Sequence, residues 1–299
     1  MEKNFTGLVD AKHGKFIFCH FDEYVGLSLR EYGEFSEIEL NFMNNFISKD
    51  DIVLDIGSNI GAFTIPFAKK VGYNGKVIAF EPQDFIFKIL NGNIALNSLR
   101  NVECHNIGLG KNNGYKYLND VDYSDVGNFG GFSMHGVQKN NEFLKLRKNK
   151  NKIIIQKLDN FLHLKKCNFL KMDAEGMEQN ILLGGEKFIN KYRPIMFIEN
   201  NPTFPNDLNY KIMKKNYKVY WFFSLYYNSR NYFVNNRNYF KEYNAGKDVG
   251  THNIICIPEE KKINLSLDSI EDKYSKPLVC FTDYYKPTSQ HNNSEKNLI

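Results

Sequence analysis

The chain reads Ile52-Val53-Leu54-Asp55-Ile56-Gly57-Ser58-Asn59-Ile60-Gly61, an apolar run that leads directly into a glycine-containing turn. The run predicts a buried β-strand over residues 52–56, and a helical pattern follows over residues 60–71. Because Gly57 and Gly61 carry no side chain, a ligand can approach the backbone of the turn where the helix starts. The turn therefore predicts a site for a nucleotide-containing ligand, formed by Asp55, Gly57, Ser58, Asn59 and Gly61.

A carboxylate follows the next predicted strand, residues 76–80, at Glu81-Pro82. Glu81 stands where an acid can accept hydrogen bonds from both hydroxyls of an adenosine ribose. Asp55 would repel the pyrophosphate of a dinucleotide, and the turn lacks the third glycine of the dinucleotide fingerprint. S-adenosylmethionine carries a sulfonium and an ammonium group, so its positive charges suit an acidic turn. The alternative is an ordinary strand-to-helix turn capped by Asn59.

Strand and helix patterns alternate between residues 51 and 200, which predicts an α/β fold with a mostly parallel sheet and helices on both faces. The predicted strands are residues 52–56, 76–80, 102–107, 169–172 and 195–198, and the predicted helices are residues 60–71, 85–96 and 177–189. Glycines break residues 108–160 into short β-like runs, which predict a β-hairpin insertion after the third strand. Residues 217–223 and 253–257 predict an antiparallel strand pair at the C-terminal end, after a helix over residues 208–216.

The remaining segments predict extensions at both ends of a main domain. We expect an N-terminal extension with a cap helix at residues 1–49, the main domain at residues 50–258, and a C-terminal extension at residues 259–299 that ends in a loose tail, residues 286–299. In the N-terminal extension, residues 15–19 predict a strand, and Ser36 and Glu39 have the spacing of a capping box. The predicted apolar face of the cap helix contains Ile38, Phe42, Met43, Phe46 and Ile47.

The composition limits the partners and the compartment. The chain has 299 residues, and its 39 basic and 34 acidic residues give a net charge of +5 without a basic stripe. Nucleic acid is therefore not an expected partner. Five widely separated cysteines form neither a disulfide framework nor a zinc pair, and no apolar run approaches the roughly 20 residues that span a bilayer. These features predict a soluble, cytoplasmic protein without a membrane span, and they leave its oligomeric state open.

Three motifs occur in the order and spacing of a known family, namely Asp55-Ile-Gly57-Ser-Asn59-Ile-Gly61, Glu81-Pro82 and Phe169-Leu-Lys171-Met-Asp173-Ala-Glu175-Gly176. The chain resembles the FkbM-type methyltransferases from about Tyr32 to Pro258. The resemblance implies a class I, Rossmann-like S-adenosylmethionine fold and O-methylation, commonly of sugars or natural products. Many methyltransferases have an acid near the adenine amino group where this chain has Asn106-Ile107, and the Asn106 amide oxygen could accept the same hydrogen bond.

Asp173, Glu175 and Glu199 fall at the carboxyl ends of predicted strands, where open α/β sheets bind their ligands. Methyl transfer to a hydroxyl needs a group that accepts the proton, and Asp173 is the first candidate for this general base. Glu175 is the second candidate, unless it only begins the following helix. His135 lies in a glycine-rich segment that could fold over the site, as a base or as an ordinary surface histidine. Asp173, Glu199 and Asn200 could also hold Mg²⁺, although carboxylates at strand ends are common without a metal.

The loop after residue 223 combines aromatic and amide side chains, which suit sugars because rings stack on C–H faces and amides bond hydroxyls. Tyr226, Asn228, Arg230 and Glu199 are the predicted acceptor-binding residues, although a core strand followed by a polar loop explains the same pattern. The sequence thus predicts an O-methyltransferase that acts on a hydroxyl of a sugar, a glycan or a related small molecule. The alternatives are a non-catalytic glycan-binding protein of the same fold and, third, an NAD-dependent oxidoreductase.

Overall fold

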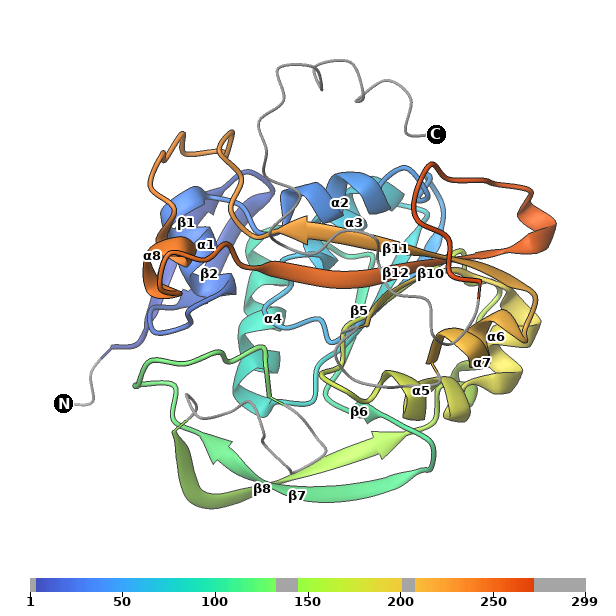
Figure 1. The fold of residues 1–299 in the computed structure, drawn as a ribbon. Helices are drawn as coiled ribbons and strands as arrows, with labels where there is room; N and C mark the ends of the chain where they lie inside the picture. Colours follow the sequence, from blue (N-terminus) through green and yellow to red (C-terminus); the bar gives the residue numbers. More distant parts are fainter. Residues whose placement is uncertain (1–3, 133–144, 201–207, 272–299) are drawn as a thin grey trace.

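The computed structural model describes residues 4–132, 145–200 and 208–271. Its centre is a seven-stranded sheet in the order β11-β12-β10-β9-β3-β4-β5 (Figure 1). Neighbouring strands are parallel except at β12, which runs antiparallel to both β10 and β11. The bounds are β3 Ile52–Ile56, β4 Lys76–Phe80, β5 Val102–His105, β9 Phe169–Met172, β10 Ile195–Glu199, β11 Tyr217–Leu225 and β12 Gly250–Pro258. The predicted mostly parallel α/β sheet with an antiparallel pair at its C-terminal end is confirmed.

Helices cover both faces of this sheet, as predicted. Successive side chains of a strand point to opposite faces, and these strands are apolar on both, so each face needs a layer of helices. Val53, Phe169 and Phe197 pack into one apolar core with helices α2 (Glu37–Met43) and α3 (Thr64–Val71). Their neighbours Leu54 and Leu170 pack into a second core with the helices of the opposite face. Those helices are α4 (Asp84–Leu96), α5 (Glu178–Gly184), α6 (Glu186–Tyr192) and α7 (Leu208–Met213).

Three predicted helices are shorter than the sequence pattern indicates, and the one expected over residues 208–216 ends at Met213. The helix expected over residues 60–71 begins only at Thr64, because the glycine turn occupies the residues before it. The helix expected over residues 177–189 is divided between α5 and α6. A Cβ atom on Gly184 would lie 2.0 Å from the carbonyl oxygen of Gly110, so only glycine fits where the chain bends.

The insertion after β5 forms a separate three-stranded sheet rather than a lone hairpin. β7 (Gly114–Val121) and β8 (Leu146–Gln156) pair antiparallel, and the short β6 (Gly108–Leu109) pairs parallel with β8. Figure 1 shows this sheet at the bottom of the view, apart from the central sheet. The predicted hairpin is confirmed, although the third strand ends at His105 rather than at residue 107. Two short 3-10 helices, η1 (Leu158–Phe161) and η2 (Glu259–Lys261), follow β8 and β12.

A hairpin and two helices precede the central sheet. The hairpin consists of β1 (Thr6–Ala11) and β2 (Gly14–Cys19), and helix α1 (Val25–Tyr32) follows it. The α1 residues Leu27 and Tyr32 pack with Phe240 of α8 (Tyr239–Tyr243) in a small core of their own. We call these three residues the aromatic core, because two of them are aromatic and tyrosine side chains pack around them. It is separate from the two cores of the central sheet.

The capping box predicted for the start of α2 is wrong. Ser36 has a left-handed backbone with φ 44°, and its side chain makes no capping hydrogen bond. Glu39 points into the protein, where its carboxylate accepts hydrogen bonds from Ser224 Oγ at 3.0 Å and from Asn253 Nδ2 at 2.8 Å. Ile38, predicted on the apolar face, is 44% exposed. Helix α2 therefore buries a carboxylate against the sheet, which its sequence pattern does not indicate.

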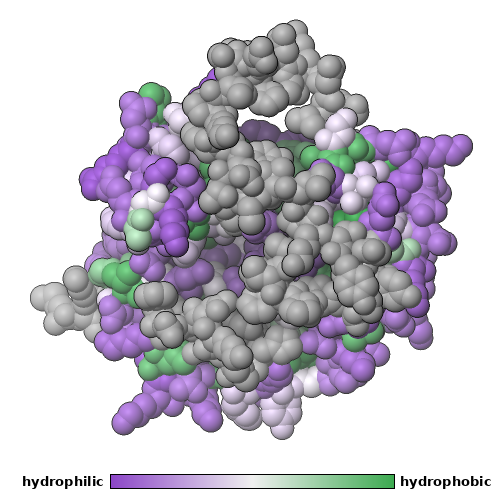
Figure 2. All heavy atoms as spheres, viewed as in Figure 1, coloured by the Kyte–Doolittle hydropathy of each residue, from purple (hydrophilic) through white to green (hydrophobic). Residues whose placement is uncertain are grey.

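Some predictions concern parts of the chain outside the described residues. The loose tail expected at residues 286–299 and the candidate base His135 are among them. Across the described residues, none of the helices combines the length and the apolar character needed to cross a membrane. On the face that Figure 2 shows, the described residues are mostly hydrophilic, and hydrophobic side chains appear in small separate patches.

Candidate functional site

Two adjoining clefts open at the carboxyl ends of β3, β4 and β9. The first cleft has apolar walls, formed by Phe80, Pro82, Ile107, Leu109, Phe132 and Ile181. The second cleft has an aromatic wall, formed by Tyr24, Phe35, Phe63 and Tyr226. The residues that line both clefts are Gly57, Glu81, Gly130, Asp173 and Glu175. The clefts therefore meet where open α/β sheets bind their ligands.

Backbone hydrogen bonds hold the glycine turn between β3 and α3. The N–H groups of Gly57 and Ser58 both donate to the Phe80 carbonyl at 3.0 Å. The Ser58 hydroxyl donates to the Asp55 carbonyl at 2.7 Å. Gly57 has φ 76°, and a Cβ atom there would lie 1.7 Å from the carbonyl oxygen of Asp173. Position 57 therefore requires glycine, both for its φ and for its contact with the loop after β9.

The turn brings most of its predicted binding residues to the clefts. Gly57 lines both clefts, and Ser58 and Asn59 line the second. Gly61 lines neither cleft. It has φ 92°, and its N–H donates to the Ser58 carbonyl at 2.9 Å, so this glycine shapes the turn.

Glu81 lies at the boundary of the two clefts and is 4% exposed. Its carboxylate accepts hydrogen bonds from the backbone N–H groups of Asn59 at 3.0 Å and Gln83 at 2.9 Å. Burial raises the pKa of Glu81 to about 7, because the two N–H donors only partly offset the loss of water. Ile107 lines the first cleft, whereas Asn106 lines neither and donates from Nδ2 to the Glu81 carbonyl at 2.9 Å. The Asn106 side chain thus holds the backbone of Glu81 in place without lining the cleft.

Asp55 is predicted to face a ligand, but it is fully buried and lines neither cleft. The alternation along β3 explains this correction, because Asp55 shares the α3 face of the sheet with Val53. Its Oδ2 accepts a hydrogen bond from the Thr64 hydroxyl at 2.6 Å, and its Oδ1 lies 3.7 Å from Lys171 Nζ. Burial raises the pKa of Asp55, and the Lys171 charge opposes that shift. Asp55 therefore acts inside the protein, beneath the turn.

The sheet face covered by α2 and α3 turns from apolar to polar at the strand ends. Two residues after the apolar positions Val53, Phe169 and Phe197, this face carries Asp55, Lys171 and Glu199. Asp55 and Lys171 are register partners between β3 and β9, and Glu199 pairs with Asn253 of β12. Glu39 of α2 covers the group, and burial raises the pKa of Glu39 to about 7. These residues, namely Asp55, Lys171, Asn253, Glu39 and the half-buried Glu199, form what we call the buried polar cluster, which lies beside the second cleft.

Three acids predicted at the strand ends lie together. One carboxylate oxygen each of Asp173, Glu175 and Glu199 lies within 4.8 Å of the others. Burial, with added repulsion from Asp173, raises the pKa of Glu175 to about 8 and that of Glu199 well above its usual range. Glu175 has a left-handed φ of 51°, and α5 begins only at Glu178. The interpretation of Glu175 as the start of the helix is therefore wrong.

The structure brings two of the three predicted magnesium ligands together. Asp173 and Glu199 belong to the three-acid group, whose third member is Glu175. The Lys171 ammonium, 3.4 Å from Asp173 Oδ2, already supplies a positive charge to the group. Carboxylates gather in this way without a metal, so the arrangement alone assigns none.

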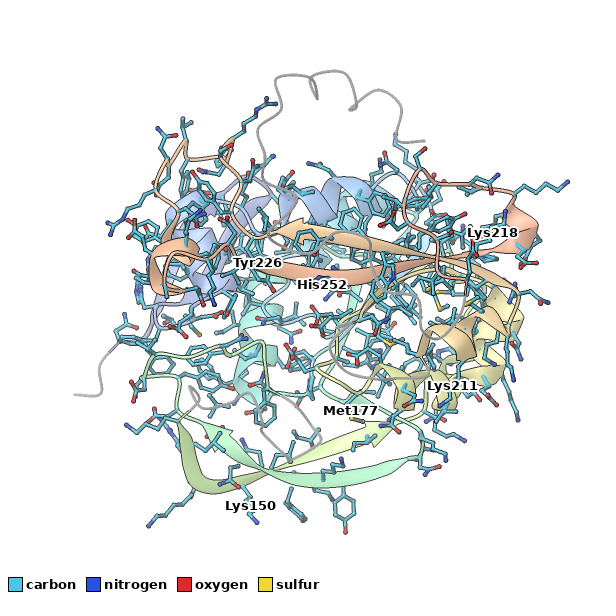
Figure 3. The ribbon with its side chains drawn as sticks, viewed as in Figure 1. Lys150, Met177, Lys211, Lys218, Tyr226 and His252 are labelled. Carbon is cyan, nitrogen blue, oxygen red and sulfur yellow. The ribbon has the colours of Figure 1, made fainter. Side chains whose placement is uncertain are left out.

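Tyr226 lies where an acceptor-binding residue is expected. It lines the second cleft, stacked on Phe35 with ring centroids 5.8 Å apart and edge-on to Tyr24 at 5.4 Å. Figure 3 shows Tyr226 at the end of β11 opposite Lys218, on the side of α8. Its ring is therefore held by aromatic neighbours from the N-terminal extension.

Asn228 and Arg230 lie away from both clefts. Asn228 Nδ2 donates to Glu34 Oε1 at 2.8 Å, and the Tyr232 N–H donates to Glu34 Oε2 at 3.0 Å. Arg230 is exposed at the outer side of this loop. The polar pattern that predicts sugar contacts here instead fastens the loop to the N-terminal extension.

Sequence reasoning missed several residues of the clefts. Lys171 lines the second cleft, and a signal existed, because a charged side chain stands inside the buried strand β9. Gln83 lines the first cleft and ties it to residues 123–129, since it accepts from the Tyr123 hydroxyl and donates to the Phe129 carbonyl. Tyr24 belongs to the N-terminal extension, and no local pattern marks it as a cleft residue.

A family model described as the methyltransferase FkbM domain matches residues 55–244 of this chain. The chain belongs to the FkbM methyltransferase family. The matched range of the FkbM domain includes the glycine turn, Glu81 and the three-acid group. Tyr24, Phe35 and Glu39 lie outside it. With the central sheet, this membership confirms the class I, Rossmann-like fold that the sequence predicts.

Individual relatives of this FkbM-family chain cover it in part. Methyltransferase 1 of Beauveria bassiana (strain ARSEF 2860) is 30% identical over an alignment of 150 residues, and the match covers 45% of this chain and 58% of that protein. The solved methyltransferase FkbM of Methylobacillus flagellatus KT is 16% identical with a TM-score of 0.44, over 70% of this chain and 44% of that one. TYW2 of M. jannaschii in complex with AdoMet is 15% identical with a TM-score of 0.40, over 86% of each chain. The chain thus spans little more than half of the curated relative.

Proposed function

We propose that this FkbM-family protein transfers a methyl group from S-adenosylmethionine to a hydroxyl oxygen of a sugar, a glycan or a related small molecule. The position of Asp173 supports the proposal most directly, because Asp173 lines both clefts. The first cleft suits the cofactor and the second suits the acceptor. A proton acceptor therefore stands where the two reactants would meet.

The first cleft has the chemistry that an adenosine needs. Ile107 and Leu109 offer an apolar surface against which a purine can pack. Glu81 offers carboxylate oxygens for the ribose hydroxyls, and two backbone N–H donors fix their orientation. Asp173 also lines this cleft, and the negative charge of its carboxylate suits the sulfonium group. These residues would hold S-adenosylmethionine.

The reaction asks the protein chiefly for position and for a proton acceptor. S-adenosylmethionine supplies an electrophilic methyl group, whose bond to sulfur breaks, leaving its electron pair on sulfur, as the oxygen–carbon bond forms. Asp173 accepts the proton that the acceptor hydroxyl loses, so the products are a methyl ether, S-adenosylhomocysteine and a protonated carboxyl group. The Asp173 side chain is 42% exposed, which lets it pass this proton to water.

The aromatic wall of the second cleft supports a sugar as the acceptor. Tyr24, Phe35 and Tyr226 lie in ring-to-ring contact along this wall, and sugars pack their C–H faces on such rings. Asp173 and Glu175 offer oxygens to the hydroxyls of the same ring. An acceptor with both an apolar face and several hydroxyls fits this combination.

The proposal is tested by incubating the protein with S-adenosylmethionine, labelled in its methyl group, and a panel of methyl glycosides. We expect one glycoside to gain a methyl group that withstands alkali, as an ether does and an ester does not. Calorimetry with S-adenosylhomocysteine and with NAD should detect binding of the first alone. Binding without transfer to any hydroxyl would favour the non-catalytic alternative, and binding of NAD instead would favour an oxidoreductase.

A further inference from the structure

Lys171 is the only lysine or arginine among the described residues that line either cleft. Its side chain is 5% exposed, and its Nζ lies 3.4 Å from Asp173 Oδ2 and 3.7 Å from Asp55 Oδ1. The same ammonium donates to the Gly57 carbonyl at 3.2 Å and lies 5.1 Å from the centroid of the Phe63 ring. One buried cation therefore contacts the glycine turn, the acid beneath it and the proposed base.

Acids outnumber this cation. Those that interact with it electrostatically come from four places in the fold: β3, α2, the end of β4 and the loop after β9. They are Asp55, Glu39, Glu81, Asp173 and Glu175. Burial alone would lower the pKa of Lys171, but the attraction of Asp173, Asp55 and Glu39 outweighs it and raises the pKa above its usual value. Lys171 is therefore charged.

Methyl transfer from a sulfonium makes the balance of charge important. The positive charge on sulfur disappears during the reaction, so negative charge beside it stabilises the bound cofactor more than the transition state. An excess of acids would therefore bind the cofactor tightly and slow the chemistry. A nearby ammonium reduces this excess and leaves the proton acceptor in place.

We propose that Lys171 is a positioning residue that fixes the Asp173 carboxylate and limits how tightly the surrounding acids hold the cationic cofactor. This inference rests on the proposed use of S-adenosylmethionine. Glu39 takes part from the opposite side, since Ser224 and Asn253 hold its carboxylate in the buried polar cluster with Lys171. The balance of charge around Lys171 thus includes Glu39, which lies outside the matched range of the FkbM domain.

The test compares S-adenosylmethionine, which is cationic at sulfur, with S-adenosylhomocysteine, which is neutral there. Calorimetry gives both dissociation constants for the wild-type protein and for Lys171→Met. The variant loses a positive charge near the sulfur atom, so it should bind S-adenosylmethionine more tightly relative to S-adenosylhomocysteine. We expect the Kd of S-adenosylhomocysteine divided by that of S-adenosylmethionine to rise about tenfold. A purely structural role would weaken both ligands alike and leave the ratio unchanged.

Further variants separate charge from shape. Lys171→Gln keeps a donor for the Gly57 carbonyl and carries the same test if the methionine variant does not fold. Lys171→Arg keeps the charge and should retain the wild-type ratio even where both affinities fall. Lys191→Met is the matched control, because Lys191 also donates to a carbonyl, that of Leu162, and lies over a ring, that of Tyr192. Its ratio should stay at the wild-type value.

The outcomes distinguish this inference from the proposed function. A wild-type ratio in a folded, neutral variant at position 171 would overturn the role of Lys171. An equal rise in Lys191→Met would do the same, because the effect would not belong to the cleft. If the wild-type protein bound neither ligand, the proposed function itself would fail.

Discussion

The two clefts draw their residues from the chain in different ways. The walls of the first cleft come mainly from residues 56–132, at the ends of consecutive strands. The second cleft joins Tyr24 and Phe35, near the N-terminus, to Lys171 and to Tyr226. The same three acids, Glu81, Asp173 and Glu175, line both clefts, but the first cleft has apolar walls, whereas the second has aromatic walls and the ammonium group of Lys171. Local sequence thus forms the first cleft, the proposed cofactor end, and long-range packing forms the second cleft, the proposed acceptor end.

The largest effect is expected on turnover at Asp173, which lines both clefts. The Asp173→Asn variant tests whether this residue serves the chemical step or the binding of the cofactor. Asp173→Asn keeps the shape of the side chain but removes the proton acceptor, so turnover should fall about 10²- to 10⁴-fold. Affinity for S-adenosylhomocysteine should change less than about threefold, because this ligand is neutral at sulfur and has no sulfonium charge for Asp173 to attract. Turnover is measured with the best glycoside of the panel, and affinity by calorimetry. If binding were lost while turnover survived at saturating cofactor, Asp173 would belong to the cofactor end and Glu175 would become the leading base.

A second variant addresses the proposed ribose contact, at Glu81, which also lines both clefts. Glu81→Ala removes a carboxylate that makes charge-assisted hydrogen bonds, so S-adenosylhomocysteine should bind about 30- to 1,000-fold more weakly by calorimetry. Glu103→Ala is the control, because Glu103 pairs with Lys76 and His105 on β4 and β5, away from both clefts. It should leave the affinity unchanged. Wild-type affinity in a folded Glu81→Ala protein would remove Glu81 from the cofactor site.

The pH dependence of binding tests the protonation of the same acid. Because burial raises the pKa of Glu81 to about 7, its carboxyl group is mostly protonated at pH 6 and mostly ionised at pH 8. The ionised form accepts the ribose hydrogen bonds, so affinity for S-adenosylhomocysteine should rise about tenfold from pH 6 to pH 8. Glu81→Gln cannot ionise, and its affinity should lack this rise in the same titration. A wild-type affinity that falls with pH would show that the protonated acid binds.

The smallest expected effect concerns the aromatic wall. Tyr226→Ala removes one ring from the second cleft, so the KM for the glycoside should rise about three- to tenfold while the cofactor Kd stays constant. Tyr232→Ala is the control, since Tyr232 is 54% exposed and lies away from both clefts. Steady-state kinetics with each variant give the two KM values. Equal KM values for the two variants would place the acceptor elsewhere.

The first cleft was predictable because its signals are local. A buried strand, a glycine turn and an acid after the next strand follow one another, and the structure brings Gly57 and Glu81 to the same cleft. The orientation of Asp55 was not predicted, although it follows from the alternation of side chains along β3. Val53 packs against the α3 face, so Asp55 must point there too.

The second cleft was less predictable because its residues are far apart in the sequence. The spacing of Ser36 and Glu39 fits a capping box, yet hydrogen bonds from β11 and β12 hold Glu39 inside. The aromatic and amide loop predicts sugar contacts, but Asn228 is bonded to Glu34, almost two hundred residues earlier. Such contacts depend on how the N-terminal extension packs, and no local pattern encodes that packing.

Substitutions near the aromatic core can change the second cleft without affecting the central sheet. Tyr24 and Tyr226 pack against the aromatic core and also face the second cleft, whereas the two larger cores hold the central sheet together. Substitutions around the aromatic core can therefore reshape the acceptor wall while the sheet and the cofactor end keep their own packing. Substrate preference can drift during evolution without loss of the scaffold. A mutant library for new acceptors belongs in residues 24–35 and 226–240.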